Sequence, residues 1–243
     1  KSIDIKYGEF LANTINKFLG NEKVDFISSH GHTIFHQPEK NYTLQIGNGE
    51  TIANITKIKT INNFRNLDIS LDGQGAPLVP IGDLYLFLDH KYCINLGGFA
   101  NISIKNKDTV TAFDICPSNI VLNQFSKLLG FKFDRDGEIA KRGKLIPQLL
   151  KRLNDLRFYK KHSPKSLSRE WVEEFITPLV LKEYKAEDML HTFCEHISIQ
   201  ISRFLKNESA YFTGGGTLNS YLMSRISFYS SSKIFIPNRK MIN

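Results

Sequence analysis

A paired-glycine run followed by an aspartate is the part of this sequence best suited to chemistry. The run Ile94–Ser103 reads as a strand, a Gly97-Gly98 turn and a second strand, and Asp114 follows near the end of a third strand, just before a helix. Glycine has no Cβ, so the turn lets backbone N–H groups approach an anionic ligand closely. Open α/β sheets carry their chemistry outside the carboxyl ends of the strands, where this carboxylate would lie. A plain hairpin followed by an aspartate N-cap remains the alternative for these residues.

A second glycine-rich turn, Gly214-Gly215-Gly216, follows a short apolar strand and precedes a helix that begins near Asn219. Its spacing matches neither a dinucleotide fingerprint nor a P-loop. Such a turn at a helix N-terminus can hold a flat base or a phosphate on its backbone. Taken alone, these residues favour a turn that merely needs positive φ.

Two histidines, His30 and His32, flank Gly31 at the end of a short predicted strand. Imidazoles at this spacing can bind zinc, but no carboxylate or cysteine stands nearby at ligand spacing, so no metal site is predicted. On a strand the two rings would share one face. A polar pair that hydrogen-bonds a sugar hydroxyl or a carboxylate is favoured, with ordinary packing as the alternative.

Arg65 and Asp68 are predicted at the end of a further strand. The arginine fork suits a substrate carboxylate, and Asp68 could orient the fork or accept a hydrogen bond from a hydroxyl. A surface ion pair is the alternative.

Two other charged segments are given weaker roles. Asp134–Glu138 resembles the first half of a calcium loop but lacks the closing glutamate, so a solvated turn is predicted. Ser168 is expected to cap a helix, and Lys165 and Arg169 could face an anionic ligand.

The elements that must position these residues alternate between strands and helices, which predicts an α/β fold with a mixed sheet. Strands are expected at 24–28, 43–47, 59–63, 94–96, 99–103, 210–213 and 232–236. Helices are expected from the start to Gly20 and at 50–56, 119–129, 146–153, 168–181, 186–205 and 219–226, and a further apolar helix is expected to run through Leu84 and Leu88.

Composition sets the class of protein. The 243 residues are 41% apolar, which is enough for a sizeable core. The formal charge is +8, but the basic residues form no stripe with interleaved aromatics, so nucleic acid is not a predicted partner. The positive net charge suits an anionic substrate. No apolar stretch approaches the roughly 20 residues of a membrane span, so no membrane association is predicted. Cys93, Cys116 and Cys194 form no disulfide or metal framework, which favours the cytoplasm.

Taken in chain order, the motifs resemble the anhydro-N-acetylmuramic acid kinase family, part of the superfamily of actin, sugar kinases and heat-shock ATPases. Each motif is weak or moderate, but the ordered set is highly specific and covers nearly the whole chain. The motifs are Ser29–Pro38, Thr43–Gly47, Phe64-Arg65, Gly73–Pro80, Asn95–Ser103, Phe113-Asp114 with Pro117 and Asn119, Pro164–Ser166 with Arg169-Glu170, and Gly214–Gly216 with Asn219.

The resemblance implies a two-lobed, ribonuclease-H-like fold of the actin-like ATPase type. Residues 1–66 would form the end of the first lobe and residues 67–243 the second lobe. It also implies a kinase that uses ATP and Mg²⁺. In the family a base activates a water that opens the 1,6-anhydro ring, while O6 takes the γ-phosphoryl group. Such an enzyme would serve cell-wall peptidoglycan recycling and amino-sugar catabolism in the cytoplasm, with the sugar and ATP as partners and a possible homodimer.

Residue roles carry over from the matching motifs. Asp114 would be the general base, Gly97 and Gly98 the second phosphate hairpin, and Gly214–Gly216 with Asn219 the adenosine site. The implied substrate-binding residues are His30, Gly31, His32, Arg65, Asp68, Pro117 and Asn119.

Three departures from the family pattern matter. The Gly-Thr-Ser-x-Asp-Gly phosphate loop and the glutamate-containing helix are absent, so we expect an internal piece of a longer protein that is inactive by itself. Ile115, Cys116 and Ser118 alter the loop after the aspartate. His32 replaces a glutamine, and Asn66 and Leu67 interrupt an arginine-rich run. The alternatives are therefore a catalytically silent glycan-binding or dimerisation fragment, or another amino-sugar kinase of the same fold.

Overall fold

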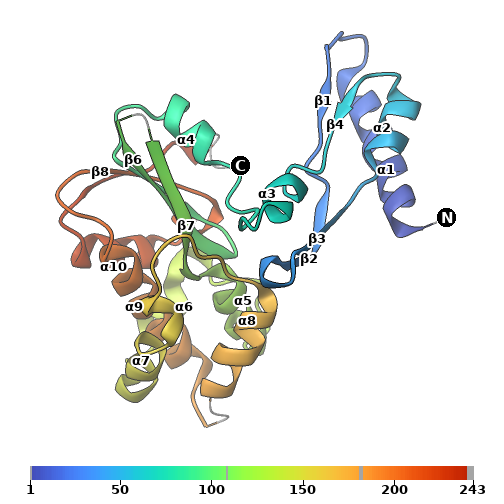
Figure 1. Ribbon diagram of the computed structural model, residues 1–243. Helices are drawn as coiled ribbons and strands as arrows, with labels where there is room; N and C mark the ends of the chain where they lie inside the picture. Colours follow the sequence, from blue (N-terminus) through green and yellow to red (C-terminus); the bar gives the residue numbers. More distant parts are fainter. Residues whose placement is uncertain (1, 108, 181–182, 240–243) are drawn as a thin grey trace. The chain divides into compact units, whose positions relative to one another are not determined.

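The structure, a computed structural model, describes residues 2–107, 109–180 and 183–239. The chain forms two compact units, Lys1–Leu78 and Val79–Asn243, and each is described by itself (Figure 1). Among the described residues, no helix combines the length and the apolar character that crossing a membrane requires.

The first unit contains two packed helices and two small sheets. Helix α1 (Ile3–Leu19) begins where the Ser2 hydroxyl accepts the N–H of Ile5 and ends at Gly20, as predicted. It packs against α2 (Gly49–Thr56) around the buried side chains of Ala12, Ile27 and Ile52. The strands are β1 (Ile27–Ser28), β2 (His32–Gln37), β3 (Tyr42–Ile46) and β4 (Thr60–Ile61), with β1 parallel to β4 and β2 antiparallel to β3.

The boundary between the units lies after Leu78, beyond the predicted lobe boundary after Asn66. Short hydrogen bonds explain the difference. The Asp68 carboxylate accepts the N–H of Gly75 at 2.6 Å, and the Asp68 carbonyl accepts the N–H of Gly73 at 2.7 Å. The Arg65 guanidinium donates to the carbonyl of Gly75. Helix α3 (Asn66–Ser70) and the turn after it are thereby tied together within the first unit, while the assignment of lobes stays a prediction.

The second unit is built on a five-stranded sheet of order β7-β6-β5-β8-β9. Its first three strands form an antiparallel meander, and β8 and β9 run parallel to β5 after helical crossovers. This strand order is that of the ribonuclease-H-like fold, which confirms the predicted α/β class. The strands are β5 (Tyr92–Leu96), β6 (Phe99–Asn106), β7 (Thr109–Pro117), β8 (Ser209–Thr213) and β9 (Lys233–Phe235).

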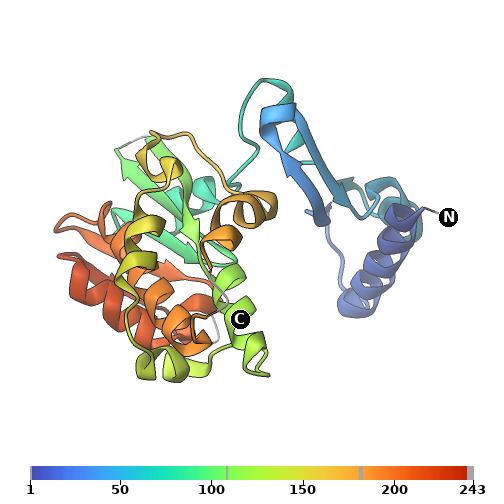
Figure 2. The ribbon, with the colours of Figure 1, turned by 90° about the horizontal axis from the view of Figure 1, so that it is seen from below.

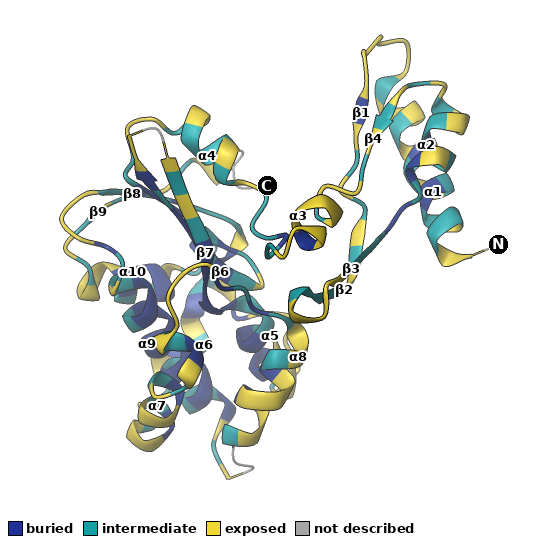
Figure 3. Cartoon of the chain, viewed as in Figure 1, coloured by how far each residue is buried: buried dark blue, intermediate teal, exposed yellow. Residues whose placement is uncertain are grey.

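Helices cover both faces of this sheet (Figure 2). Helices α5 (Asn119–Leu128), α9 (Ala186–Ser202) and α10 (Ser220–Tyr229) bury one face around a core that includes Leu96, Ile102 and Phe212. Helix α4 (Pro80–Leu86) lies on the other face, where Ser103 donates to the Asp83 carboxylate at 2.6 Å. Figure 3 shows the buried residues gathered between the sheet and the first set of helices. Helices α6 (Glu138–Arg142) and α7 (Pro147–Asn154) pack on α9.

The prediction of one continuous helix over 168–181 is wrong, because the segment forms three short helical turns. It consists of a short α8 (Arg169–Trp171), a π turn over Val172–Ile176 and a 3₁₀ turn over Thr177–Leu179. Pro178 explains the break, because proline has no N–H and clashes with the carbonyl four residues earlier. Ser168 caps α8 as expected, and Leu181 lies outside the described residues.

A polar cluster lies buried inside the helical layer of the second unit. In α9, His196 Nδ1 lies 2.9 Å from Asn154 Oδ1, and its Nε2 lies 2.9 Å from the Tyr159 hydroxyl. An amide oxygen only accepts, so Nδ1 carries the proton and Nε2 accepts from tyrosine. Burial, with a smaller contribution from the positive charge of Arg203, lowers the pKa of His196 to about 3. The imidazole is therefore neutral.

Candidate active site

The two glycine turns meet at one edge of the second unit's sheet. Strands β5 and β8 are parallel neighbours with Asn95 opposite Thr213, so the turns that follow them leave the sheet side by side. Gly214 has φ of +81°, and an added Cβ there would lie 2.8 Å from the Leu96 carbonyl oxygen. A Cβ on Gly216 would lie 2.7 Å from the Leu96 Cβ. Close approach of the two turns therefore requires glycine at these positions.

The Gly97-Gly98 hairpin is fixed to the start of helix α5. The Gly98 carbonyl accepts the N–H groups of Ser118 at 2.8 Å and Ile120 at 3.1 Å, and the Gly97 carbonyl accepts that of Asn119 at 3.2 Å. The Asn119 amide donates to the Leu96 carbonyl at 3.2 Å. These bonds set the hairpin's orientation, and its role as a phosphate turn stays a prediction.

Asp114 lies in β7 at a β-bulge. Ala100 pairs with Cys116 and Asn101 pairs with Asp114, so Ile115 is the extra residue. Bulges re-aim side chains and are common next to active sites. The prediction that Asp114 lies near the end of a strand, just before a helix, is confirmed. In the structure, Pro117 is the last residue of this strand.

Backbone groups from a distant segment hold this carboxylate. Asp114 is only 8% exposed, and its Oδ2 accepts the N–H of Leu167 at 2.8 Å. The Asp114 N–H donates to the Lys165 carbonyl at 3.0 Å. The side chain is thereby oriented at both its backbone and its carboxyl group, as a positioned base requires.

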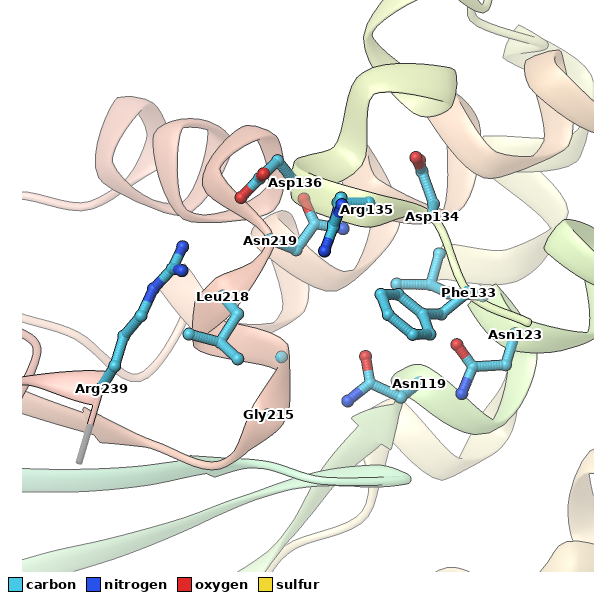
Figure 4. Close-up of a pocket in the computed structure, with 12 residues that line it drawn as sticks. Asn119, Asn123, Phe133, Asp134, Arg135, Asp136, Gly215, Leu218, Asn219 and Arg239 are labelled. Atoms are coloured by element: carbon cyan, nitrogen blue, oxygen red, sulfur yellow. The ribbon is translucent and has the colours of Figure 1, made fainter. Parts of the chain in front are cut away.

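A pocket of about 510 Å³ opens beside the turn at Gly215 and Gly216 (Figure 4). Four of its lining residues are among the predicted site residues: Asn119, Gly215, Gly216 and Asn219. The others were not predicted as site residues: Leu122, Asn123, Phe133, Asp134, Arg135, Asp136, Leu218 and Arg239. Figure 4 shows the Phe133 ring at one side of the pocket, near the amides of Asn119 and Asn123, with Leu218 and Arg239 across from it.

The solvated turn predicted at Asp134–Glu138 is wrong for Asp134. This carboxylate is buried and accepts the N–H groups of Ile139 and Ala140, each at 2.9 Å, so it caps helix α6. Gly137 has φ of +74° and abuts the Asn219 side chain, which brings the segment against a predicted nucleotide residue. An aspartate just before a short helical pattern was the available signal for the cap.

The chemistry of this pocket suits a nucleoside. Phe133 is 53% exposed and offers a flat apolar face on which a base can stack. The amides of Asn119 and Asn123 provide both donors and acceptors, and the guanidinium groups of Arg135 and Arg239 can attract phosphate. All of these groups belong to the second unit.

Five of the predicted substrate-binding residues lie in the first unit, whereas Pro117 and Asn119 lie in the second. Arg65 Nε donates to His30 Nε2 at 3.1 Å, which leaves His30 Nδ1 to donate to the Gly31 carbonyl at 3.1 Å. The expectation that His30 and His32 share a strand face is wrong, because Gly31 has φ of +69° and β2 begins only at His32. Arg65 directly precedes α3 and Asp68 lies within it, so neither is at a strand end.

The remaining charged candidates lie elsewhere in the second unit. Arg169 is exposed and forms an ion pair with Glu173 at 2.9 Å, whereas Lys165 is buried. Within the described ranges, no group of three or more His, Cys, Asp or Glu side chains is placed to hold a metal ion.

Comparison with known proteins identifies the family. The family model for anhydro-N-acetylmuramic acid kinase matches residues 1–233. The chain belongs to this family. A family member from Pseudomonas syringae pv. tomato is 37% identical over 215 residues, which cover 82% of this chain and 58% of that protein. One from Bacillus cereus is 32% identical over 254 residues, covering 93% and 66% respectively.

The chain thus spans 58% and 66% of the length of these two anhydro-N-acetylmuramic acid kinases. Among solved structures, an activator of 2-hydroxyisocaproyl-CoA dehydratase from Clostridium difficile is 13% identical, covers 87% of this chain and 86% of its own, and has a TM-score of 0.44. Membership in the family confirms the resemblance drawn from the motifs. The roles of individual residues in this chain stay predictions.

Proposed function

We propose that the full-length protein is an ATP-dependent kinase of 1,6-anhydro-N-acetylmuramic acid. The observation that carries the proposal is the family match over residues 1–233. The site geometry supports it, because a nucleoside-sized pocket opens beside the turn at Gly215 and Gly216, on the sheet that also carries the buried Asp114 carboxylate. Pockets at the carboxyl ends of strands in α/β sheets are typical ligand sites.

In the proposed reaction, Asp114 orients a water molecule and accepts its proton. The water oxygen forms a bond to the anomeric carbon of the sugar, and the bond from that carbon to O6 breaks. O6 then takes the γ-phosphoryl group of ATP. The hydrogen bond from the Leu167 N–H to the Asp114 carboxylate would hold that carboxylate in one orientation throughout the reaction.

The nucleotide would lie with its base against Phe133 and its phosphates toward the glycine turns. Mg²⁺ in kinase sites takes many of its ligands from phosphates and water, so the bound nucleotide would supply much of its coordination. The ion would neutralise phosphate charge. The proposal includes peptidoglycan recycling and amino-sugar catabolism as the cellular role, in the cytoplasm, and association of two copies as a homodimer.

The direct test is a phosphoryl-transfer assay of the full-length protein with ATP and Mg²⁺. Anhydro-N-acetylmuramic acid should give a product heavier by one water and one phosphoryl group, whereas N-acetylglucosamine and N-acetylmuramic acid should react far more slowly. Mass spectrometry of the product distinguishes ring opening from simple phosphorylation. Preference for an ordinary amino sugar would contradict the proposal and favour another kinase of this fold.

Gly215→Val should raise the KM for ATP about tenfold without lowering thermal stability. An added Cβ at Gly215 meets no atom within 4 Å, so the side chain would occupy the open space of the pocket. Gly216→Val is the contrast, since its Cβ would meet Leu96 and should lower the Tm. Steady-state kinetics and thermal unfolding separate the two effects. An unchanged KM for ATP in Gly215→Val would contradict the nucleotide assignment.

Arg65→Lys should weaken use of the acid sugar more than use of an analogue that lacks the lactyl carboxylate. An ammonium cannot reproduce a bidentate fork, and the difference should reach about 1.5–3 kcal/mol. The measurement is kcat/KM for both enzymes on both sugars. Arg65 also binds His30 and Gly75, so equal losses on the two sugars would show that it supports the first unit and does not recognise the carboxylate.

A further inference from the structure

A second cavity, of about 280 Å³, lies in the second unit and shares no lining residue with the nucleoside-sized pocket. Part of its wall is apolar and comes from Ile104, Phe113 and Phe204. The remaining lining is polar: Asn106 and Thr111 belong to β6 and β7, and Lys161, His162, Ser163 and Lys165 belong to the segment that follows the 3₁₀ turn Arg157–Lys160. The basic residues are Lys161, His162 and Lys165.

Lys165 is the unusual member of this wall, because it is a buried cation. Its side chain is only 6% exposed, and Nζ donates to the Phe158 carbonyl at a long 3.4 Å. The nitrogen also lies over the rings of Phe158, Phe113 and Phe204, at 4.7, 5.7 and 5.8 Å from their centroids. Aromatic rings attract an ammonium group but carry no net charge to balance it.

The charges around Lys165 do not compensate it either. Burial lowers the pKa of Lys165, and the nearby positive charges of Arg203 and Lys161 lower it further. The neighbouring Cys116 thiol is neutral, because burial raises its pKa far above the usual range. Among the described residues, no carboxylate contributes to the shift at Lys165. A buried charge without a counterion is costly, and an anion entering the cavity would relieve that cost.

We propose that this cavity binds a small organic anion, with its carboxylate on the Lys165 ammonium and its apolar body against Ile104, Phe113 and Phe204. The positive charges of Lys161 and Lys165 favour a negatively charged ligand. The apolar wall favours a ligand with a hydrocarbon part over an inorganic oxyanion. The cavity is large enough for an anion the size of a benzoate. Nothing in this proposal depends on the kinase reaction.

The site would be coupled to Asp114 through the backbone. Lys165 supplies the carbonyl that accepts the Asp114 N–H, and Leu167, two residues on, donates to the Asp114 carboxylate. An anion that pins the Lys165 side chain would therefore steady the segment that orients Asp114.

Titration of the full-length protein with benzoate and its neutral isostere benzamide tests the proposal. The imidazole resonance of His162, assigned by comparison with His162→Gln, reports locally on the cavity. Benzoate should shift this resonance saturably, and benzamide at the same concentrations should not. Lys165→Met should weaken benzoate binding about tenfold or more, Lys161→Met a few-fold, and the exposed Lys151→Met not at all.

Three results would overturn the proposal: equal responses to benzoate and benzamide, unchanged benzoate affinity in Lys165→Met, or tighter binding of inorganic phosphate than of benzoate. Methionine has a similar length and no charge, so Lys165→Met is expected to fold. If it does not, Lys161→Met decides, because Lys161 is exposed and its replacement leaves the core untouched. An unchanged benzoate affinity in that variant would then reject the site.

Discussion

Asp114→Asn should lower the turnover of the full-length protein by about 10²-fold or more while leaving the binding of ATP and sugar nearly intact. The amide has the shape of the carboxylate and can still accept the Leu167 N–H, so the variant should fold. It cannot accept a proton from water, and loss of a positioned base usually has an effect of this size. Single-turnover kinetics together with equilibrium binding of both substrates measure the two parts.

The matched control is Asp83→Asn, which alters another partly buried carboxylate of the same unit. Asp83 lies in α4, accepts a hydrogen bond from Ser103 and does not line the pocket at Gly215 and Gly216, so its replacement should leave turnover within a few-fold of the parent. Near-normal turnover of Asp114→Asn would reject the assignment of the base. Equal losses in both variants would indicate damage to the fold.

Acidification should cost this protein several kcal/mol of stability through His196 alone. The folded pKa is about 3, whereas an unfolded histidine titrates near 6.5. Between these values the unfolded chain binds a proton that the folded chain excludes, so stability is full above pH 6.5 and falls as the pH drops toward 3. Each pKa unit corresponds to about 1.4 kcal/mol.

Denaturant unfolding of the parent and of His196→Gln, from pH 7 to pH 4, measures this contribution. The variant should be less stable at neutral pH, because the bonds to Asn154 and Tyr159 are weakened, yet it should lose less stability on acidification. Since carboxylates also titrate in this range, the informative quantity is the difference between the two profiles. Parallel profiles would contradict the prediction, and the exposed His162→Gln controls for removal of an imidazole as such.

Local patterns predicted the elements that position the site. Apolar periodicity and the glycine at Gly20 set the first helix, and strand-helix alternation led to the correct fold class. The turn at Gly214 could be predicted because closely packed backbones leave room only for glycine there, and the turn at Gly97 could be predicted from the paired glycines in the sequence. These features depend on residues that are close in the sequence.

The parts that were missed depend on residues far apart in the sequence. Phe133 and Asp134 line the pocket because Gly137 packs against Asn219, and no local pattern records that contact. The bulge at Ile115 likewise arises from pairing with another strand. His196 reads in the sequence as one polar residue in an apolar helix, and its partner Asn154 lies on a different helix.

The hydrogen bonds that join the Gly97-Gly98 hairpin to the start of helix α5 change the electrostatic potential at the hairpin. The first N–H groups of a helix carry the positive end of the helix dipole. Here the N–H groups of Ser118, Asn119 and Ile120 donate hydrogen bonds to the carbonyls of Gly97 and Gly98. Each carbonyl belongs to a peptide group whose N–H points the other way, and hydrogen-bonded peptide groups polarise one another. The hairpin peptide groups therefore extend the positive potential of the helix N-terminus to the outward-facing N–H groups of the hairpin. An anion bound to the Gly98 N–H would experience the end of α5 without touching it.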